Sequence, residues 1–215
     1  MAQVPTGSLF HIASAIATAK TVTAVSNAAE AVVTATHDFA IGDIVIISSG
    51  WSRLNKRAFR VKSVSTTVSF ILEGCNTTST NFFPVGSGTG TVSKVSTFTQ
   101  ITTVMSPSSS GGEPKTVTYR FIESDTECMI NDGFSATSYS LDIDSDTIGT
   151  PGYTALKTLT DAQTDTVLMI TSRNGSFQLI PCTAALNEAV QMSDGTINKC
   201  RVAFNGLAKL VRYGS

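Results

Sequence analysis

Hydrophobic and polar residues alternate along most of the chain, and a period of two residues predicts short β-strands separated by tight turns. In the first half of the chain the alternation predicts strands at residues 22–25, 31–35, 44–47, 57–64, 68–73 and 91–95. In the second half it predicts strands at residues 98–105, 115–123, 137–143, 166–172, 176–181, 184–192 and 196–204. The expected fold is therefore mainly β.

One segment has helical spacing instead. Thr150 suits a helix N-cap and Pro151 suits the first helical position. Tyr153, Leu156, Leu159 and Ala162 then recur every three residues and form one apolar stripe. We expect a helix at residues 151–163 whose stripe covers one opening or face of the sheet.

Three segments lack clear periodicity. Residues 1–20 are predicted to form an extended arm that leads into the fold. Residues 106–114, with the sequence S-P-S-S-S-G-G-E-P, have the composition of a flexible loop. Residues 124–136 are predicted to be a second, longer irregular segment. Long loops in compact domains are usually functional or mobile, so both loops are candidates for contacts with a partner.

Turn signals organise the C-terminal part of the chain. Asn174-Gly175 is a strong hairpin signal, and Ser193-Asp194-Gly195 marks another turn. The strands around these turns are expected to form an antiparallel meander.

The composition suggests a subunit rather than an isolated protein. Charged residues make up 14% of the chain, against roughly 25% in typical soluble domains. A surface with few charges defends poorly against association, and sheet edges need covering. We therefore expect the chain to bury much of its surface against copies of itself.

The net charge of −1 gives no global signature of nucleic-acid or membrane binding. The charge is nevertheless uneven along the chain. Residues 1–96 carry seven basic and four acidic residues, or +3, and residues 97–215 carry eight and twelve, or −4. No stretch approaches the ~20 apolar residues of a membrane span, and no signal-peptide pattern opens the sequence.

The sequence shows no nucleophile–base pair and no phosphate-binding loop. Asp142-x-Asp144-x-Asp146 resembles the start of a calcium loop, but Thr147 replaces the expected Gly and Tyr153 the expected Glu. A strand with one acidic face is the favoured interpretation. The four cysteines Cys75, Cys128, Cys182 and Cys200 are expected to be free, mostly buried thiols, although Cys182 and Cys200 could face each other across late strands.

A basic cluster and a tryptophan lie together in the first half. The cluster is Arg53, Lys56, Arg57, Arg60 and Lys62. It could contact phosphates, but a solvated strand face is favoured. Trp51 could be a sugar-stacking platform, although a half-buried cap is the favoured interpretation.

Several stretches in this order resemble the tail tube protein, or major tail protein, of long-tailed bacteriophages. They are residues 4–13, 108–119, 130–138 (I-N-D-G-F-S-A-T-S), 148–161 (I-G-T-P-G-Y-T-A-L-K-T-L-T-D) and 180–188. Residues 22–95 resemble a small β-barrel module that recurs in phage tail proteins and is similar to one in ubiquitin-activating enzymes. In the phage proteins it is a structural insert without the enzyme's chemistry.

The resemblance implies a tail-tube-type β-sandwich or barrel with one helix, formed by residues 1–20 and 96–215, with residues 21–95 as an inserted β-barrel module. It implies a structural subunit without catalysis or cofactor. Six copies would form a ring, and stacked rings would form a hollow tube that conducts double-stranded DNA. The protein would be a virion component of a flexible-tailed phage, made in the host cytoplasm, with tape measure, tail tip and terminator proteins as partners.

Two groups of residues become candidates under this resemblance. Acidic residues that could line the tube are Asp142, Asp144, Glu123 and Glu188. Candidates for loops between rings are Ser108, Gly111, Gly112, Glu113, Asn131 and Asp132. The inserted module, which carries most of the basic excess, is expected to project outward.

The alternative function is a carbohydrate- or host-surface-binding module of a tail or adhesin protein, based on Trp51 and the insert. Glycan binding by a stable monomer would favour this alternative, and an elongated polymer would favour the tube.

Overall fold

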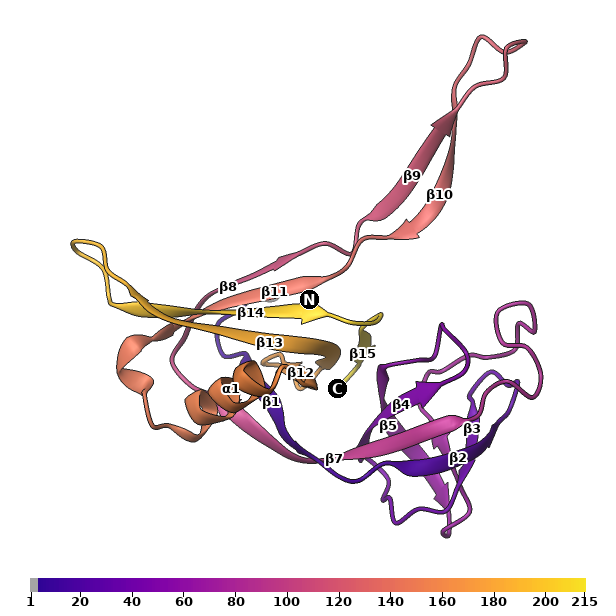
Figure 1. Cartoon of the computed structure of the whole chain (residues 1–215), viewed down its shortest axis with the longest axis horizontal. Coiled ribbons are helices and arrows are strands. Elements are labelled where there is room, and N and C mark those ends of the chain that lie inside the picture. The colour runs from indigo at the N-terminus through magenta and orange to yellow at the C-terminus, as the bar shows by residue number, and fades with distance from the viewer. Residues whose placement is uncertain (1–3) are drawn as a thin grey trace.

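A computed structural model describes residues 4–215 and consists of two β structures joined by a shared strand (Figure 1). The first is a closed barrel of six strands in the order β2-β3-β6-β5-β4-β7, and β7 pairs with β2 to complete the circle. The strands are β2 (Lys20–Val25), β3 (Val32–Ala35), β4 (Ile44–Ser49), β5 (Arg57–Ser65), β6 (Ser69–Leu72) and β7 (Gly90–Ile101). The small β-barrel module expected from the sequence is confirmed, and closure leaves it with no open sheet edge.

The barrel encloses a core of its own. Trp51, Phe59 and Phe70 are almost completely buried in it. The indole Nε1 of Trp51 donates a hydrogen bond of 2.8 Å to the carbonyl oxygen of Pro84. Gly88 lies against the indole ring, where a Cβ atom would stand 3.0 Å from the ring carbons. Trp51 is therefore a fully buried plug rather than the predicted half-buried cap, and it has no ring face available for a sugar.

The second structure is a larger sheet that does not close into a barrel, and it begins with the second half of β7. Its order is β7-β1-β12-β13-β14-β11-β8, and β15 pairs with the start of β13. The strands are β1 (Leu9–Ile16), β8 (Val104–Ser110), β11 (Ser138–Asp144), β12 (Asp165–Thr171), β13 (Phe177–Gln191), β14 (Lys199–Gly206) and β15 (Val211–Tyr213). The N-terminal segment is extended as predicted, but it is not an arm, because β1 pairs with both β7 and β12.

One helix covers the sheet. Helix α1 (Pro151–Ala162) follows a short 3-10 turn, η1 (Ser145–Thr147), and the Thr150 side chain caps its N-terminus as predicted. Its buried residues Tyr153, Leu156 and Leu159 pack into a core shared with β1, β11, β13 and β14. Three residues of the predicted stripe are therefore confirmed as the helix face that covers this core, whereas Ala162 at the end of the helix is exposed.

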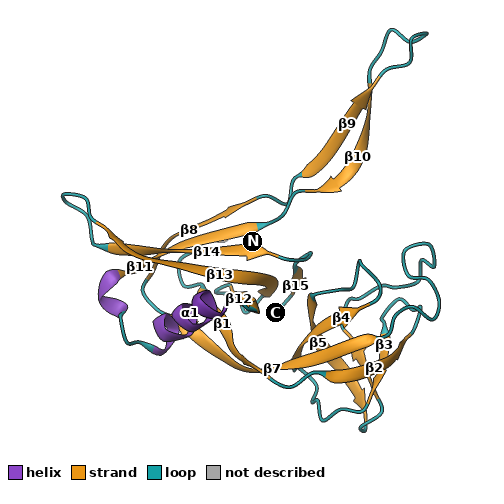
Figure 2. Cartoon of the chain, viewed as in Figure 1, coloured by secondary structure: helices purple, strands orange, loops and turns teal. Residues whose placement is uncertain are grey.

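A long hairpin extends away from the sheet (Figure 2). Strands β9 (Pro114–Tyr119) and β10 (Cys128–Phe134) pair only with each other, and we call this hairpin the arm. The arm corrects the two predicted loops, since much of residues 106–114 and 124–136 lies in β8, β9 and β10. Strand β9 lies almost entirely within the predicted strand at residues 115–123, but β10 escaped detection because every one of its residues is exposed. A strand with no buried face needs no apolar alternation.

A third apolar cluster lies between the barrel and the sheet. It includes Ile44 and Ala58 from the barrel, and Leu179 and Tyr213 from the sheet. The Tyr213 hydroxyl accepts a hydrogen bond of 2.9 Å from the Arg60 backbone N–H. The exact division into residues 21–95 and the remainder stays a prediction, because β7 belongs to both structures.

Candidate assembly surfaces

Four strands at one end of the sheet have a buried face and a polar face. We call β13, β14, β11 and β8 the open sheet. Leu141 of β11 lies opposite Val202 of β14, which lies opposite Leu186 of β13, and this row packs in the core under helix α1. Alternate residues point the other way. The helix therefore covers the apolar face of the sheet, and the opposite face carries polar residues.

That opposite face, the polar face, carries both signs of charge. Asp142 lies opposite Arg201, and Asp144 lies opposite Lys199. The Lys199 ammonium donates to the Asp142 carboxylate at 2.6 Å, and the Asp142 side chain is only 13% exposed. Arg201 reaches the Ser140 hydroxyl at 3.4 Å. The four charged side chains sum to zero.

The open sheet has two free edges. Strand β8 pairs with β11 on one side only. Beyond Thr183, strand β13 pairs with β14 but no longer with β12, although the Leu186 N–H donates to the Thr160 hydroxyl of helix α1. Unpaired backbone groups along such edges form a template for another strand. The open sheet is therefore incomplete at both ends.

The predicted lumen residues do not form one surface. Asp142 and Asp144 lie on the polar face, and the Asp144 carboxylate accepts a hydrogen bond of 3.0 Å from the Asp146 backbone N–H. Glu123 is exposed in the turn at the end of the arm. Glu188 binds helix α1, which covers the opposite side of the sheet. The structure thus brings together two of the four acids.

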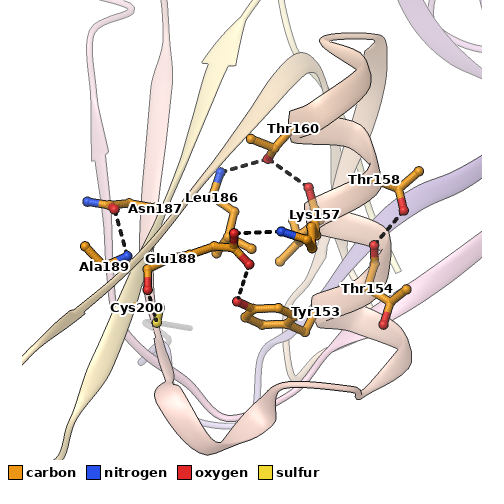
Figure 3. A network of polar contacts seen from close by, with 11 residues as sticks. Tyr153, Thr154, Lys157, Thr158, Thr160, Leu186, Asn187, Glu188, Ala189 and Cys200 are labelled. Atoms are coloured by element: carbon orange, nitrogen blue, oxygen red, sulfur yellow. Dashed lines mark hydrogen bonds and ion pairs between the residues drawn. The ribbon is translucent and has the colours of Figure 1, made fainter.

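Figure 3 shows how Glu188 is held. Its carboxylate accepts hydrogen bonds from the Tyr153 hydroxyl at 2.9 Å and the Lys157 ammonium at 2.6 Å. The bonds from Lys157 and Tyr153 lower the pKa of Glu188. Burial and the bond to Glu188 raise the pKa of Tyr153 to about 12. This network ties the helix to β13, and Thr160 reinforces it by accepting a hydrogen bond of 2.9 Å from the Leu186 N–H.

Sequence reasoning missed Lys199 and Arg201, which balance the acids of the polar face. Their signal was present, because the run K-C-R-V-A-F alternates polar and apolar residues through β14. The strand was predicted, but its polar residues could be placed beside Asp142 only once the register with β11 was known.

The candidates for contacts between rings lie in β8, in β10 and in the bend between β8 and the arm. Gly111, Gly112 and Glu113 form the bend between β8 and the arm, as a loop assignment predicts. Ser108 lies in strand β8 and Asn131 and Asp132 lie in β10, so these three are corrected from loop to strand.

The bend depends on its glycines. Gly111 and Gly112 have φ values of +77° and +76°, which residues with a side chain rarely adopt. A Cβ atom on Gly111 would lie 1.9 Å from the Ala136 carbonyl oxygen. The glycine pair therefore lets the hairpin change direction and aims the arm.

The arm exposes apolar side chains that nothing in the described chain covers. Phe121 is 64% exposed and Ile122 is 101% exposed at its tip. Other exposed apolar residues along the arm are Val117, Met129, Ile130 and Phe134. Exposed apolar residues gathered on one hairpin are characteristic of an interaction site.

The basic cluster of the barrel is mostly neutralised. The Arg60 guanidinium donates to Glu73 at 2.7 Å, and the Lys62 ammonium lies 2.6 Å from Glu30. Lys56 forms a third pair with Asp165, and Arg53 stacks over the Phe82 ring. These pairings favour a solvated structural face over a phosphate-binding patch.

All four cysteines are free, and three of them are buried; Cys128 is exposed in β10. Cys182 lies opposite Gly206 and Cys200 lies opposite Ile143, so the two thiols do not face each other. Burial raises the pKa of Cys75 to about 11 and of Cys182 to about 12. Within residues 4–215 no cluster of three His, Cys, Asp or Glu side chains could hold a metal ion.

Comparisons with known proteins identify a protein family that the chain matches. A family model for the phage tail tube protein, TTP, matches residues 49–214. No curated protein sequence matches the chain. One similar solved structure is the cryo-EM structure of the anti-feeding prophage baseplate, 6-fold symmetrised, with a TM-score of 0.35 and 10% identity over 55% of this chain and 85% of that one. Among the described residues, no helix has the length and apolar character needed to span a membrane.

Proposed function

Because the chain belongs to the phage tail tube protein family, we propose that it forms six-membered rings that stack into a hollow tube and conduct double-stranded DNA. Family membership makes it a structural component of the virion that assembles with other tail proteins. In this proposal the chain carries out no catalysis.

One observation carries the proposal: the open sheet has two free edges, a core on one face and a polar face on the other. Pairing the β8 edge of one copy with the distal β13 edge of the next would continue the sheet from copy to copy. Such head-to-tail pairing either closes into a ring or grows into a filament. A closed ring of strands would remove every open edge of this sheet.

The dimensions agree with a DNA conduit. Six copies that each contribute four strands give ~24 strands spaced ~4.8 Å apart. With a strand tilt of ~40°, the backbone barrel is about 48 Å across. This diameter leaves room for lining side chains and a DNA duplex.

The polar face would then line the tube. Duplex DNA carries one negative charge per ~1.7 Å of axis, so a strongly basic wall would hold it. Asp142 and Asp144 offset Lys199 and Arg201 on this face. A near-neutral wall would let the duplex slide.

The arm and the six-stranded barrel also have roles in this proposal. The arm would contact the adjacent ring, and the barrel would project outward from the tube. The tape measure, terminator and tail tip proteins would be partners in a flexible-tailed virion, with synthesis in the host cytoplasm. The alternative, a carbohydrate-binding module, loses its main support because Trp51 is 1% exposed.

Edge pairing can be tested with two matched substitutions of exposed valines. Val190, 39% exposed, lies in distal β13, and Val85, 77% exposed, lies on the barrel. Lysine on an edge strand discourages further pairing. Val190→Lys should abolish rings and tubes in electron micrographs of concentrated protein, whereas Val85→Lys should leave them intact. Normal tubes from Val190→Lys would contradict pairing at this edge.

A further inference from the structure

The tip of the arm presents two exposed apolar side chains on a turn. Phe121 and Ile122 project from the turn between β9 and β10, and Ile122 is as exposed as a free residue. Tyr119 supports Phe121 edge to face, with ring centroids 5.3 Å apart. Two adjacent apolar side chains presented on a supported turn form a compact hydrophobic knob.

A groove of fitting character lies at the root of the same arm. It encloses about 450 Å³ between Phe134–Thr137 and the segment Gly206–Leu210. Much of its lining is apolar or small, and includes Leu207, Ala208 and Leu210. Concave, mostly apolar sites of this size bind compact apolar groups. We call this site the root groove.

A chain cannot fill its own root groove with its own tip. Ten residues separate Gly112, at the groove, from Ile122, and paired strands advance ~3.3 Å per residue. The tip therefore lies roughly 30 Å away, held there by strand pairing (Figure 1). Any Phe121–Ile122 knob that enters a root groove belongs to another copy.

The charges favour the same contact. Residues 120–127 at the tip carry one basic and three acidic residues, a net charge of 1 − 3 = −2. The root groove contains Lys209, which has no ion-pair partner within residues 4–215. Opposite charges around an apolar contact orient the approach and disfavour wrong partners.

We propose that the Phe121–Ile122 tip of one copy inserts into the root groove of another copy. The knob and groove are different surfaces of the same chain, so the contact is head-to-tail and can repeat from copy to copy. The inference rests on the proposed tube only for its placement between rings, where arms would run from tip to root along the axis. The contact itself requires only a second copy.

Site-directed cross-linking tests this contact. Two chains are prepared with the exposed Cys128 replaced by serine, one carrying Ile122→Cys and the other Ala208→Cys. The three remaining cysteines are buried and stay unchanged. The chains, one of them size-tagged, are mixed at high concentration and treated with a mild thiol oxidant. The expected product is a disulfide-linked pair that contains one chain of each kind.

The control is an exposed apolar residue outside the groove. Ile41 of the barrel is 68% exposed and Ala208 is half-buried, so a chain carrying Ile41→Cys presents a thiol that is more accessible than the one in the groove. Mixed with the Ile122→Cys chain, it should give little product. Equal cross-linking of both pairs, or exclusive Ile122→Cys homodimers, would overturn the proposal.

Electron micrographs of the same samples separate this proposal from the proposed function. Tubes without the mixed cross-link would overturn tip insertion and leave the tube intact. A mixed cross-link without tubes would support tip insertion and count against the tube. Absence of both would contradict the two proposals independently.

Discussion

The closed barrel and the open sheet with its arm solve the same edge problem in opposite ways. The barrel joins β2 to β7, surrounds Trp51, Phe59 and Phe70, and completes its hydrogen bonding within one chain. The open sheet leaves β8 and distal β13 unpaired, and the arm exposes its apolar side chains to solvent. The difference shows which part satisfies its own strand edges and which part leaves them open, and under our proposal copies of the chain complete the latter.

The sharpest test of this contrast compares two phenylalanines. Phe59 is completely buried in the barrel, and Phe121 is 64% exposed on the arm. Phe59→Ala should lower the free energy of unfolding by about 3–5 kcal/mol, because it leaves a cavity. Phe121→Ala should change monomer stability by less than ~0.5 kcal/mol, as exposed sites do. Denaturant unfolding measures both, and equal losses would contradict the contrast.

The bend of the arm should be the next most sensitive point. Gly111→Ala combines an unfavourable positive φ with a Cβ atom 1.9 Å from the Ala136 carbonyl oxygen. We expect a loss of about 1–3 kcal/mol or a redirected arm. Thermal unfolding and micrographs of assembled protein would report these effects. Gly214→Ala, where a Cβ atom meets nothing within 4 Å, is the control that should behave as the unchanged protein.

The attachment of the barrel to the sheet should have a smaller effect. Tyr213→Phe removes a hydroxyl that accepts from the Arg60 N–H and lies 3.3 Å from the Glu73 carbonyl oxygen. A loss of about 1–2 kcal/mol is expected, because a partly buried donor is left unsatisfied. The exposed Tyr119→Phe provides the comparison. Equal stability of the two variants would indicate that the junction does not depend on this hydroxyl.

The smallest effect concerns alkaline pH and the helix. The pKa of Tyr153 rises from an ordinary value of 10.0 to about 12 on folding. The unfolded state therefore loses the tyrosine proton first, and stability from this group declines as pH rises from about 10 to about 12. The free energy of unfolding of Tyr153→Phe should fall less steeply with pH over this range than that of the unchanged protein. Identical pH profiles would show that the tyrosine does not contribute.

The sequence predicted those strands and the helix whose residues follow a clear local pattern. Buried faces gave clear alternation in the barrel, and Thr150, Pro151 and the stripe from Tyr153 to Leu159 marked the helix. Strand β9 was predicted within residues 115–123, but β10 was missed because it has no buried face, and the serines and glycines of residues 106–114 resemble loop composition.

The candidate surfaces depended on pairing between distant strands. Asp142 and Glu188 both lie in or beside predicted strands, but only the register places Asp142 with Lys199 and leaves Glu188 with Tyr153. A strand's own sequence shows which residues share a face but not which face meets the helix. The neutral polar face therefore emerged only from the assembled sheet.

The central claim is that the open sheet closes into a ring of six copies, and cryo-electron microscopy of the concentrated protein tests it directly. We expect a six-fold hollow tube whose inner wall is a continuous β-barrel formed by β13, β14, β11 and β8, with the six-stranded barrels outside. A tube whose wall is built from the six-stranded barrels, or particles that remain monomeric at every concentration, would contradict it.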